Sequence, residues 1–173
     1  MGTAVAVPLE QYLRTAYRPD CDYVEGELLE RNMGEQAHAT LQGFLFGVFW
    51  TNRDSWQLRA LPEQRLQVTS TRFRNPDVCV VRRSDPRDPI LHTPPLLCIE
   101  ILSSDDSLRS LQQRVQDYLD MGVENIWVVD PWNRVAYYAS SQGYIHPTDG
   151  FLHLPGTEAA VSLEELFREL EIA

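Results

Sequence analysis

The chain has 173 residues, a formal net charge of −10 and a hydrophobic fraction of 43%. This composition excludes a disordered chain, and the length is enough for one domain, residues 1–173, with a proper core. The acidic balance disfavours binding of nucleic acid or an anionic membrane by bulk electrostatics, but it leaves room for a local basic patch or for carboxylates that hold a metal. All fifteen basic residues are arginines, so the chain has no lysine.

The N-terminal stretch MGTAVAVPLEQ lacks the basic region and the long apolar core of a signal peptide, and no apolar run reaches the length of a membrane span. We therefore expect a cytoplasmic protein with no membrane partner. Cys21, Cys79 and Cys98 are odd in number and show no CxxC spacing, and two of them lie in strand-like runs. Reduced, buried thiols are expected.

The first half of the chain predicts helices and strands in alternation. Apolar residues recur at helical spacing near the N-terminus, and Glu25-Gly26 predicts the tight turn of a hairpin. The expected elements are a helix over Pro8–Tyr17, a hairpin over Asp22–Arg31, a long helix over Glu35–Asn52, and strands over Trp56–Val68 and Thr69–Arg83.

A Pro-rich loop, residues 87–95, precedes a strand–helix–strand unit. The helix has N-cap groups at Asp105–Ser107 and a natural stop at Gly122, and Ser162 with Glu165 forms a capping box for a closing helix. The expected elements are the strand LLCIEIL (96–102), a helix over Ser107–Met121, the strands NIWVVDP, RVAYYAS, GYIHP and FLHLP, and the helix SLEELFREL.

A helix, an antiparallel meander and a strand–helix–strand unit together predict an α/β fold with a mixed sheet. The unit LLCIEIL, helix, NIWVVD is expected to be a right-handed parallel crossover. Functional sites of such sheets lie beyond the carboxyl ends of the strands.

Two acidic residues stand where the strand pattern requires apolar ones. Asp77 begins DVCVV, and Glu100 lies inside LLCIEIL. Alternate residues of a strand share a face, so the two carboxylates meet if their strands are neighbours in register. A hard divalent cation such as Mg²⁺ would make this pair favourable. Alternatively, Glu100 pairs with a buried arginine as a structural ion pair, or it lies on an edge strand and faces solvent.

The chain resembles one family in the order of four features. They are RNPDVCVV, LLCIEILSSDD about twenty residues on, a helix ending in MGV, and the strand ENIWVVDP. This family is the Uma-type (Uma-two) family of restriction endonucleases, in the PD-(D/E)XK nuclease superfamily. The resemblance extends over nearly the whole chain, because it also includes DYVEGELLE, His38 with its long helix, and SLEELF. The resemblance implies a restriction-endonuclease-like mixed β-sheet core flanked by helices.

The resemblance also implies site residues. Asp77 and Glu100 would be the metal-binding carboxylates, the carbonyl of Ile101 would be a further ligand, and the metal would be Mg²⁺ or Mn²⁺. Asp22 matches an acidic residue before the hairpin and would complete the acidic cluster. His38 matches a histidine of the family, although a solvated residue in the first turn of the helix is an equal alternative.

The superfamily motif has a lysine two residues after the glutamate. This chain departs from the motif there, because it has Leu102 at that position. In many Uma-type sequences the basic residue comes from the next helix, in a stretch that resembles QQRVQDYL, and the matching residue here is Arg114. Arginine stays protonated, so it would clamp a phosphate but would not act as a base. The alternative is an ordinary surface arginine.

The leading hypothesis is a metal-dependent endonuclease that hydrolyses DNA phosphodiester bonds, with activity reduced by the missing lysine. The resemblance also implies a homodimer, since nucleases of this type often pair to cut both strands. The competing hypothesis is a catalytically degenerate nuclease fold that acts in binding or protein interaction. One segment has an excess of arginine and is a candidate patch that faces phosphate. Its arginines are Arg65, Arg72, Arg74, Arg82, Arg83 and Arg87. They outnumber the acidic residues of the same segment, which are Glu63, Asp77, Asp85 and Asp88.

Overall fold

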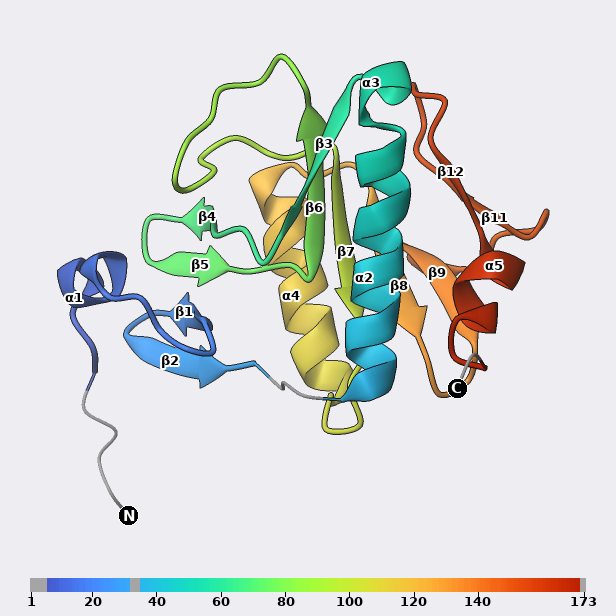
Figure 1. Cartoon of the computed structure of the whole chain (residues 1–173). Coiled ribbons are helices and arrows are strands. Elements are labelled where there is room, and N and C mark those ends of the chain that lie inside the picture. Colours follow the sequence, from blue (N-terminus) through green and yellow to red (C-terminus); the bar gives the residue numbers. More distant parts are fainter. Residues whose placement is uncertain (1–5, 32–34, 172–173) are drawn as a thin grey trace.

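A computed structural model describes residues 6–31 and 35–171 (Figure 1). Residues 1–5, the start of the segment considered above for a signal peptide, lie outside the described residues. Within the described ranges, no helix has both the length and the apolar character that a membrane crossing requires. The helices are α1 (Leu9–Arg14), α2 (Gln36–Thr51), α3 (Arg53–Trp56), α4 (Leu108–Met121) and α5 (Leu163–Arg168).

The strands form a six-stranded sheet, a four-stranded sheet and a two-stranded sheet. The strands are β1 (Cys21–Val24), β2 (Glu27–Glu30), β3 (Leu58–Pro62), β4 (Leu66–Thr69), β5 (Arg72–Arg74), β6 (Val78–Arg82), β7 (Leu97–Ile101), β8 (Ile126–Asp130), β9 (Val135–Ser140), β10 (Gly143–Ile145), β11 (Phe151–His153) and β12 (Ala160–Ser162).

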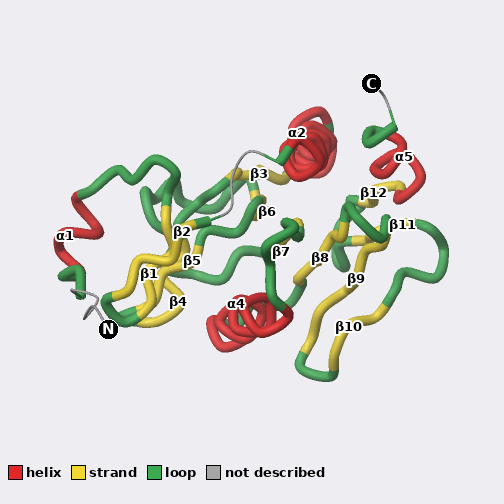
Figure 2. Tube along the Cα trace, turned by 90° about the horizontal axis from the view of Figure 1, so that it is seen from below, coloured by secondary structure: helices red, strands yellow, loops and turns green. Residues whose placement is uncertain are grey.

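The six-stranded sheet is mixed and has the order β10-β9-β8-β7-β6-β3. Its β7 and β8 are parallel and are joined through α4, whereas its other neighbouring strands are antiparallel. Figure 2 shows α4 on one face of this sheet, and α2 and α5 on the other. The predicted α/β fold with a mixed sheet is therefore confirmed.

The prediction of two long strands after the long helix is wrong. Residue 56 ends the short helix α3, and each predicted strand is divided in two. The chain leaves the six-stranded sheet at Glu63, whose φ is 51°, and returns to it at Val78. Between these points β4 and β5 join β1 and β2 in the four-stranded sheet, of order β2-β1-β5-β4 (Figure 1). This excursion brings Asp22 of β1 next to Asn75, just before the start of β6.

Strand alternation sorts the core of the main sheet into two layers. Val78, Val80, Leu97, Ile99 and Ile101 pack with α2, which contributes the buried side chains Leu41, Leu45 and Phe49. Cys79, Val81 and Cys98 pack on the opposite face with α4. Because Glu100 is two residues from Cys98, it also faces α4. All three cysteines are free and buried, as the sequence predicted.

The predicted caps of α4 are present at both ends. Ser107 accepts a hydrogen bond from the Ser110 N–H, and Gly122 ends the helix with a φ of 98°. A Gly122→Ala substitution is expected to cost about 1–2 kcal/mol of unfolding free energy, since a residue with a Cβ is strained in the left-handed region.

Gly43→Ala in α2 is the matched control for the Gly122 prediction. A Cβ at Gly43 would meet nothing within 4 Å, whereas a Cβ at Gly122 would lie 3.4 Å from Pro94 Cγ. The control is therefore expected to stabilise the protein by about 0.5–1 kcal/mol. Urea unfolding of both variants measures the difference, and effects of the same sign would contradict the explanation.

Candidate functional site

The two acidic residues singled out by the strand pattern lie next to each other at the ends of β6 and β7. The register pairs Val78 with Ile99, which sets Asp77 opposite Glu100. Asp77 Oδ2 accepts a 2.7 Å hydrogen bond from the Ile101 N–H. Both carboxyl groups are buried, with exposed fractions of 2% and 1% for the two residues. Two charges in this environment require partners.

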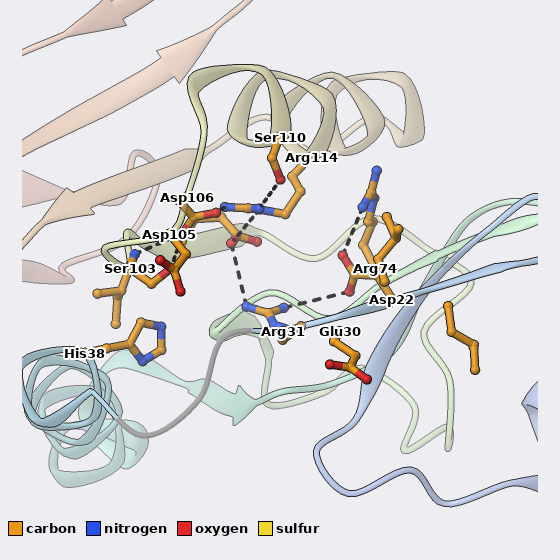
Figure 3. Close-up of a pocket in the computed structure, with 14 residues that line it drawn as sticks. Asp22, Glu30, Arg31, His38, Arg74, Ser103, Asp105, Asp106, Ser110 and Arg114 are labelled. Atoms are coloured by element: carbon orange, nitrogen blue, oxygen red, sulfur yellow. Dashed lines mark hydrogen bonds and ion pairs between the residues drawn. The ribbon is translucent and has the colours of Figure 1, made fainter. Parts of the chain in front are cut away.

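Arg31, which follows β2, is the shared counter-ion of the acidic residues. Its Nη2 lies 2.5 Å from Asp77 Oδ1 and 3.7 Å from Glu100 Oε2, and its Nη1 lies 3.9 Å from Asp22 Oδ1. Figure 3 shows Arg31 reaching into the pocket toward Asp22. Arg31 is not among the site residues predicted from the sequence, because no local pattern distinguishes it from the other arginines.

Glu100 has two further partners on α4. The Tyr118 hydroxyl donates a hydrogen bond to Oε1, and Arg114 Nε lies 3.0 Å from Oε2. That Arg114 nitrogen is not aligned for a hydrogen bond, so the contact is an ion pair. Arg114 also donates to Asp106 and to Ser110, both at 2.9 Å. Arg114 therefore lies against the site, as predicted, and is not an ordinary surface group.

His38, in the first turns of α2, lies at the same carboxylate. Its Nε2 is 3.2 Å from Asp77 Oδ1, and its side chain is 16% exposed. The alternative of a solvated residue at the start of the helix is therefore wrong. Burial would lower the pKa of His38, but the hydrogen bond and the charge of Asp77 outweigh burial and raise it. His38 thus adds a second positively polarised group beside Asp77.

The two central carboxyl groups differ in pKa. Burial opposes the ionisation of Asp77, but Arg31, His38 and the Ile101 N–H overcome it and lower the pKa of this group. Burial and the charge of Asp77 raise the pKa of Glu100, against the effect of Arg114 and Arg31. Asp77 is therefore the firmly anionic member of the pair.

Asp22 connects the site to the four-stranded sheet. Its Oδ1 accepts from the Asn75 N–H at 2.9 Å, and its Oδ2 accepts from Arg74 Nη1 at 3.0 Å. Arg74 Nε in turn donates to Asp117 of α4 at 2.7 Å. The residue predicted to complete the acidic cluster thus lines the same pocket as Glu100, and it is held there by a buried arginine.

A pocket of about 340 Å³ opens over Glu100, Arg31 and Asp22, whereas the buried Asp77 lies behind its lining. Five carboxylates and three guanidinium groups line it, so the charged lining is net negative. Leu102 supplies no charge: it packs against the apolar cluster under α4. Four of the six arginines predicted to form a basic patch are paired with acids; these pairs are Arg65 with Asp20, Arg72 and Arg74 with Asp117, and Arg83 with Asp54.

The donor set fits a divalent cation in one respect. Asp77 and Glu100 converge on a single cationic atom, Arg31 Nη2, and carboxylate oxygens are the ligands that Mg²⁺ and Mn²⁺ prefer. Within residues 6–31 and 35–171, no group of three or more His, Cys, Asp or Glu side chains is arranged to hold a metal. Backbone carbonyl and water ligands would therefore have to complete the coordination.

The fold is a mixed β-sheet core flanked by helices (Figure 2), as the family resemblance implied. The chain belongs to the Uma2 family, whose model is described as "Putative restriction endonuclease" and matches residues 9–173. It is also similar to a crystal structure from Anabaena variabilis described as "a putative nuclease belonging to DUF820". The TM-score is 0.81 with 24% identity, over 95% of this chain and 99% of that one. A comparison with curated proteins found no match.

Proposed function

We propose that this protein is a divalent-metal-dependent endonuclease that hydrolyses DNA phosphodiester bonds at the Asp77–Glu100 pair. The convergence of both carboxylates on one cationic position carries the proposal. The family supports nuclease function in general. The net negative lining of the pocket favours a cation over a bare phosphate, so the metal would bind before the DNA backbone.

Asp77 and Glu100 would hold the metal, with the carbonyl of Ile101 as a further ligand. The N–H and C=O of one strand residue point to the same side, and the Ile101 N–H points at Asp77. When bound, Mg²⁺ or Mn²⁺ supplies an activated water and neutralises charge on the phosphate. Asp22 and Arg74 would fix the acidic cluster from the four-stranded sheet.

Arg114 would replace part of the function of the missing lysine. Its guanidinium lies beside Glu100 on the side of α4, where it stabilises negative charge but cannot accept a proton. Its hydrogen bonds to Asp106 and Ser110 restrict how far the side chain can extend toward a substrate. Losing one charge-stabilising donor costs roughly 10²–10³-fold in rate, so we expect slow cleavage compared with a site that retains its lysine.

Supercoiled plasmid tests the proposed activity. The wild-type protein is expected to convert it to nicked and linear forms with Mg²⁺ or Mn²⁺, and EDTA is expected to stop the reaction. Calorimetric titration with Mn²⁺ measures metal binding on the same preparation. No cleavage together with no metal binding would contradict the nuclease proposal.

A second candidate function is a nuclease fold that binds without cutting. One observation favours it: all four carboxylate oxygens of Asp77 and Glu100 already have protein partners. Such saturation is typical of a structural ion-pair cluster. Metal binding without cleavage would support this candidate over the endonuclease. DNA binding with neither metal binding nor cleavage would support it as well.

A further inference from the structure

Arg31 and Arg114 both contact Glu100, but they are held differently. Arg114 donates hydrogen bonds through both terminal nitrogens, to Asp106 and to Ser110. Among the described residues, Arg31 donates one hydrogen bond, from Nη2 to Asp77, and its buried Nη1 has no hydrogen-bond partner there. The 3.9 Å from Nη1 to Asp22 is too long for a hydrogen bond. Within the described part of the chain, Arg31 therefore has fewer hydrogen bonds than Arg114 and is held mainly by ion pairs.

The position of Arg31 conflicts with a metal. Its Nη2 occupies the point from which both Asp77 and Glu100 are in ion-pair range. A divalent cation held by the same two carboxylates would come within a few ångströms of the guanidinium, and this repulsion is strong where water is largely excluded. Arginine cannot relieve it by losing a proton. The two cations thus exclude each other from this position.

We propose that Arg31 is an exchangeable counter-ion of the carboxylate pair: it neutralises Asp77 and Glu100 until a divalent cation takes its place, and it then binds the phosphate of the substrate. This inference rests on the proposed function. It assigns to Arg31 the direct phosphate contact that Leu102 does not supply, and it leaves to Arg114 the stabilisation of negative charge from beside Glu100.

The chemistry of the side chain suits the second role. A guanidinium presents several N–H donors in a planar fork that matches phosphate oxygens, and it loses little hydration on binding them. Arg31 lines the pocket and its side chain is 17% exposed, so a phosphate brought to the metal would lie within reach of the released side chain. Arg114 would stay with Asp106 and Glu100.

Metal titration of Arg31→Met tests the exchange. Because the metal no longer has to displace a cation, the variant is expected to bind Mn²⁺ at least about tenfold more tightly than wild type in calorimetry. Arg65→Met is the matched control: Arg65 lies 2.5 Å from Asp20 and its side chain is 14% exposed, close to the values for Arg31, but it is not in the pocket. The control is expected to leave Mn²⁺ affinity unchanged.

Thermal unfolding provides a readout that does not depend on cleavage. Without Arg31 the carboxylates repel each other, so Arg31→Met is expected to unfold at a lower temperature in EDTA and to gain at least about 4 °C more from Mn²⁺ than wild type. Arg31→Gln keeps a hydrogen-bond donor for Asp77 and serves if the Met variant does not fold. The single-turnover cleavage rate of either variant is expected to fall roughly 10²–10³-fold.

The outcomes separate this inference from the proposed function. If wild type binds Mn²⁺ and cuts DNA but the Arg31 variants bind Mn²⁺ no more tightly, the exchange is overturned and the nuclease stands. Tighter binding with an unchanged cleavage rate would overturn the phosphate contact. If neither wild type nor the variants bind Mn²⁺, both proposals fail. Binding by the variants alone would overturn the exchange, because it would show that Arg31 keeps the wild-type site closed to the metal.

Discussion

Asp77→Asn and Glu100→Gln are each expected to lower the rate of metal-dependent plasmid cleavage by at least about 10³-fold. Each substitution keeps the size of the side chain but removes one of the two negative charges that would hold the metal. Asp77 has the larger expected effect, because it is also the group whose pKa its neighbours lower. Single-turnover nicking of supercoiled DNA, together with Mn²⁺ titration, measures the loss of cleavage and of binding.

Asp54→Asn is the control for these two variants. Asp54 is also paired with an arginine, Arg83, but its side chain is 67% exposed and it does not line the pocket. Its cleavage rate and metal affinity should match those of wild type. Full cleavage by a folded Asp77→Asn protein would place the reaction elsewhere, and circular dichroism checks that the variant is folded.

Arg74→Met is expected to cost about 3–5 kcal/mol of unfolding free energy, since removing one member of a buried ion-pair network leaves its partners uncompensated. Arg74 is 3% exposed, and it joins Asp22 of β1 to Asp117 of α4. It is thus a link between the four-stranded sheet and the helix that carries Arg114. Urea unfolding, with comparison of the denaturant slopes, measures the cost.

Arg83→Met provides the contrast for Arg74. The Arg83–Asp54 pair is formed by exposed side chains, at 45% and 67%, and such pairs contribute little because water and salt screen them. This variant is expected to change the unfolding free energy by less than about 1 kcal/mol. A similar cost for both arginines would show that burial of the network does not determine its contribution.

Local sequence patterns determined the elements whose interactions lie within a few residues. The cap at Ser107 and the stop at Gly122 bound α4 as predicted, and Glu25 and Gly26, with φ of 51° and 96°, form the expected hairpin turn. The period of two along β6 and β7 also placed Asp77 beside Glu100 once the strands paired. Family resemblance then indicated Arg114, which helical geometry brought to the site.

Tertiary structure alone decided how the meander is divided between two sheets and which cation the acids share. β4 and β5 leave the main sheet because they pair with the N-terminal hairpin, and a strand pattern does not encode its partner. Arg31 is 46 residues from Asp77 along the chain, so no periodicity relates the two. The sequence predicted the two acids by itself, because an ionisable group in an apolar strand breaks a local pattern. Their counter-ion breaks no pattern, and only the folded chain identifies it.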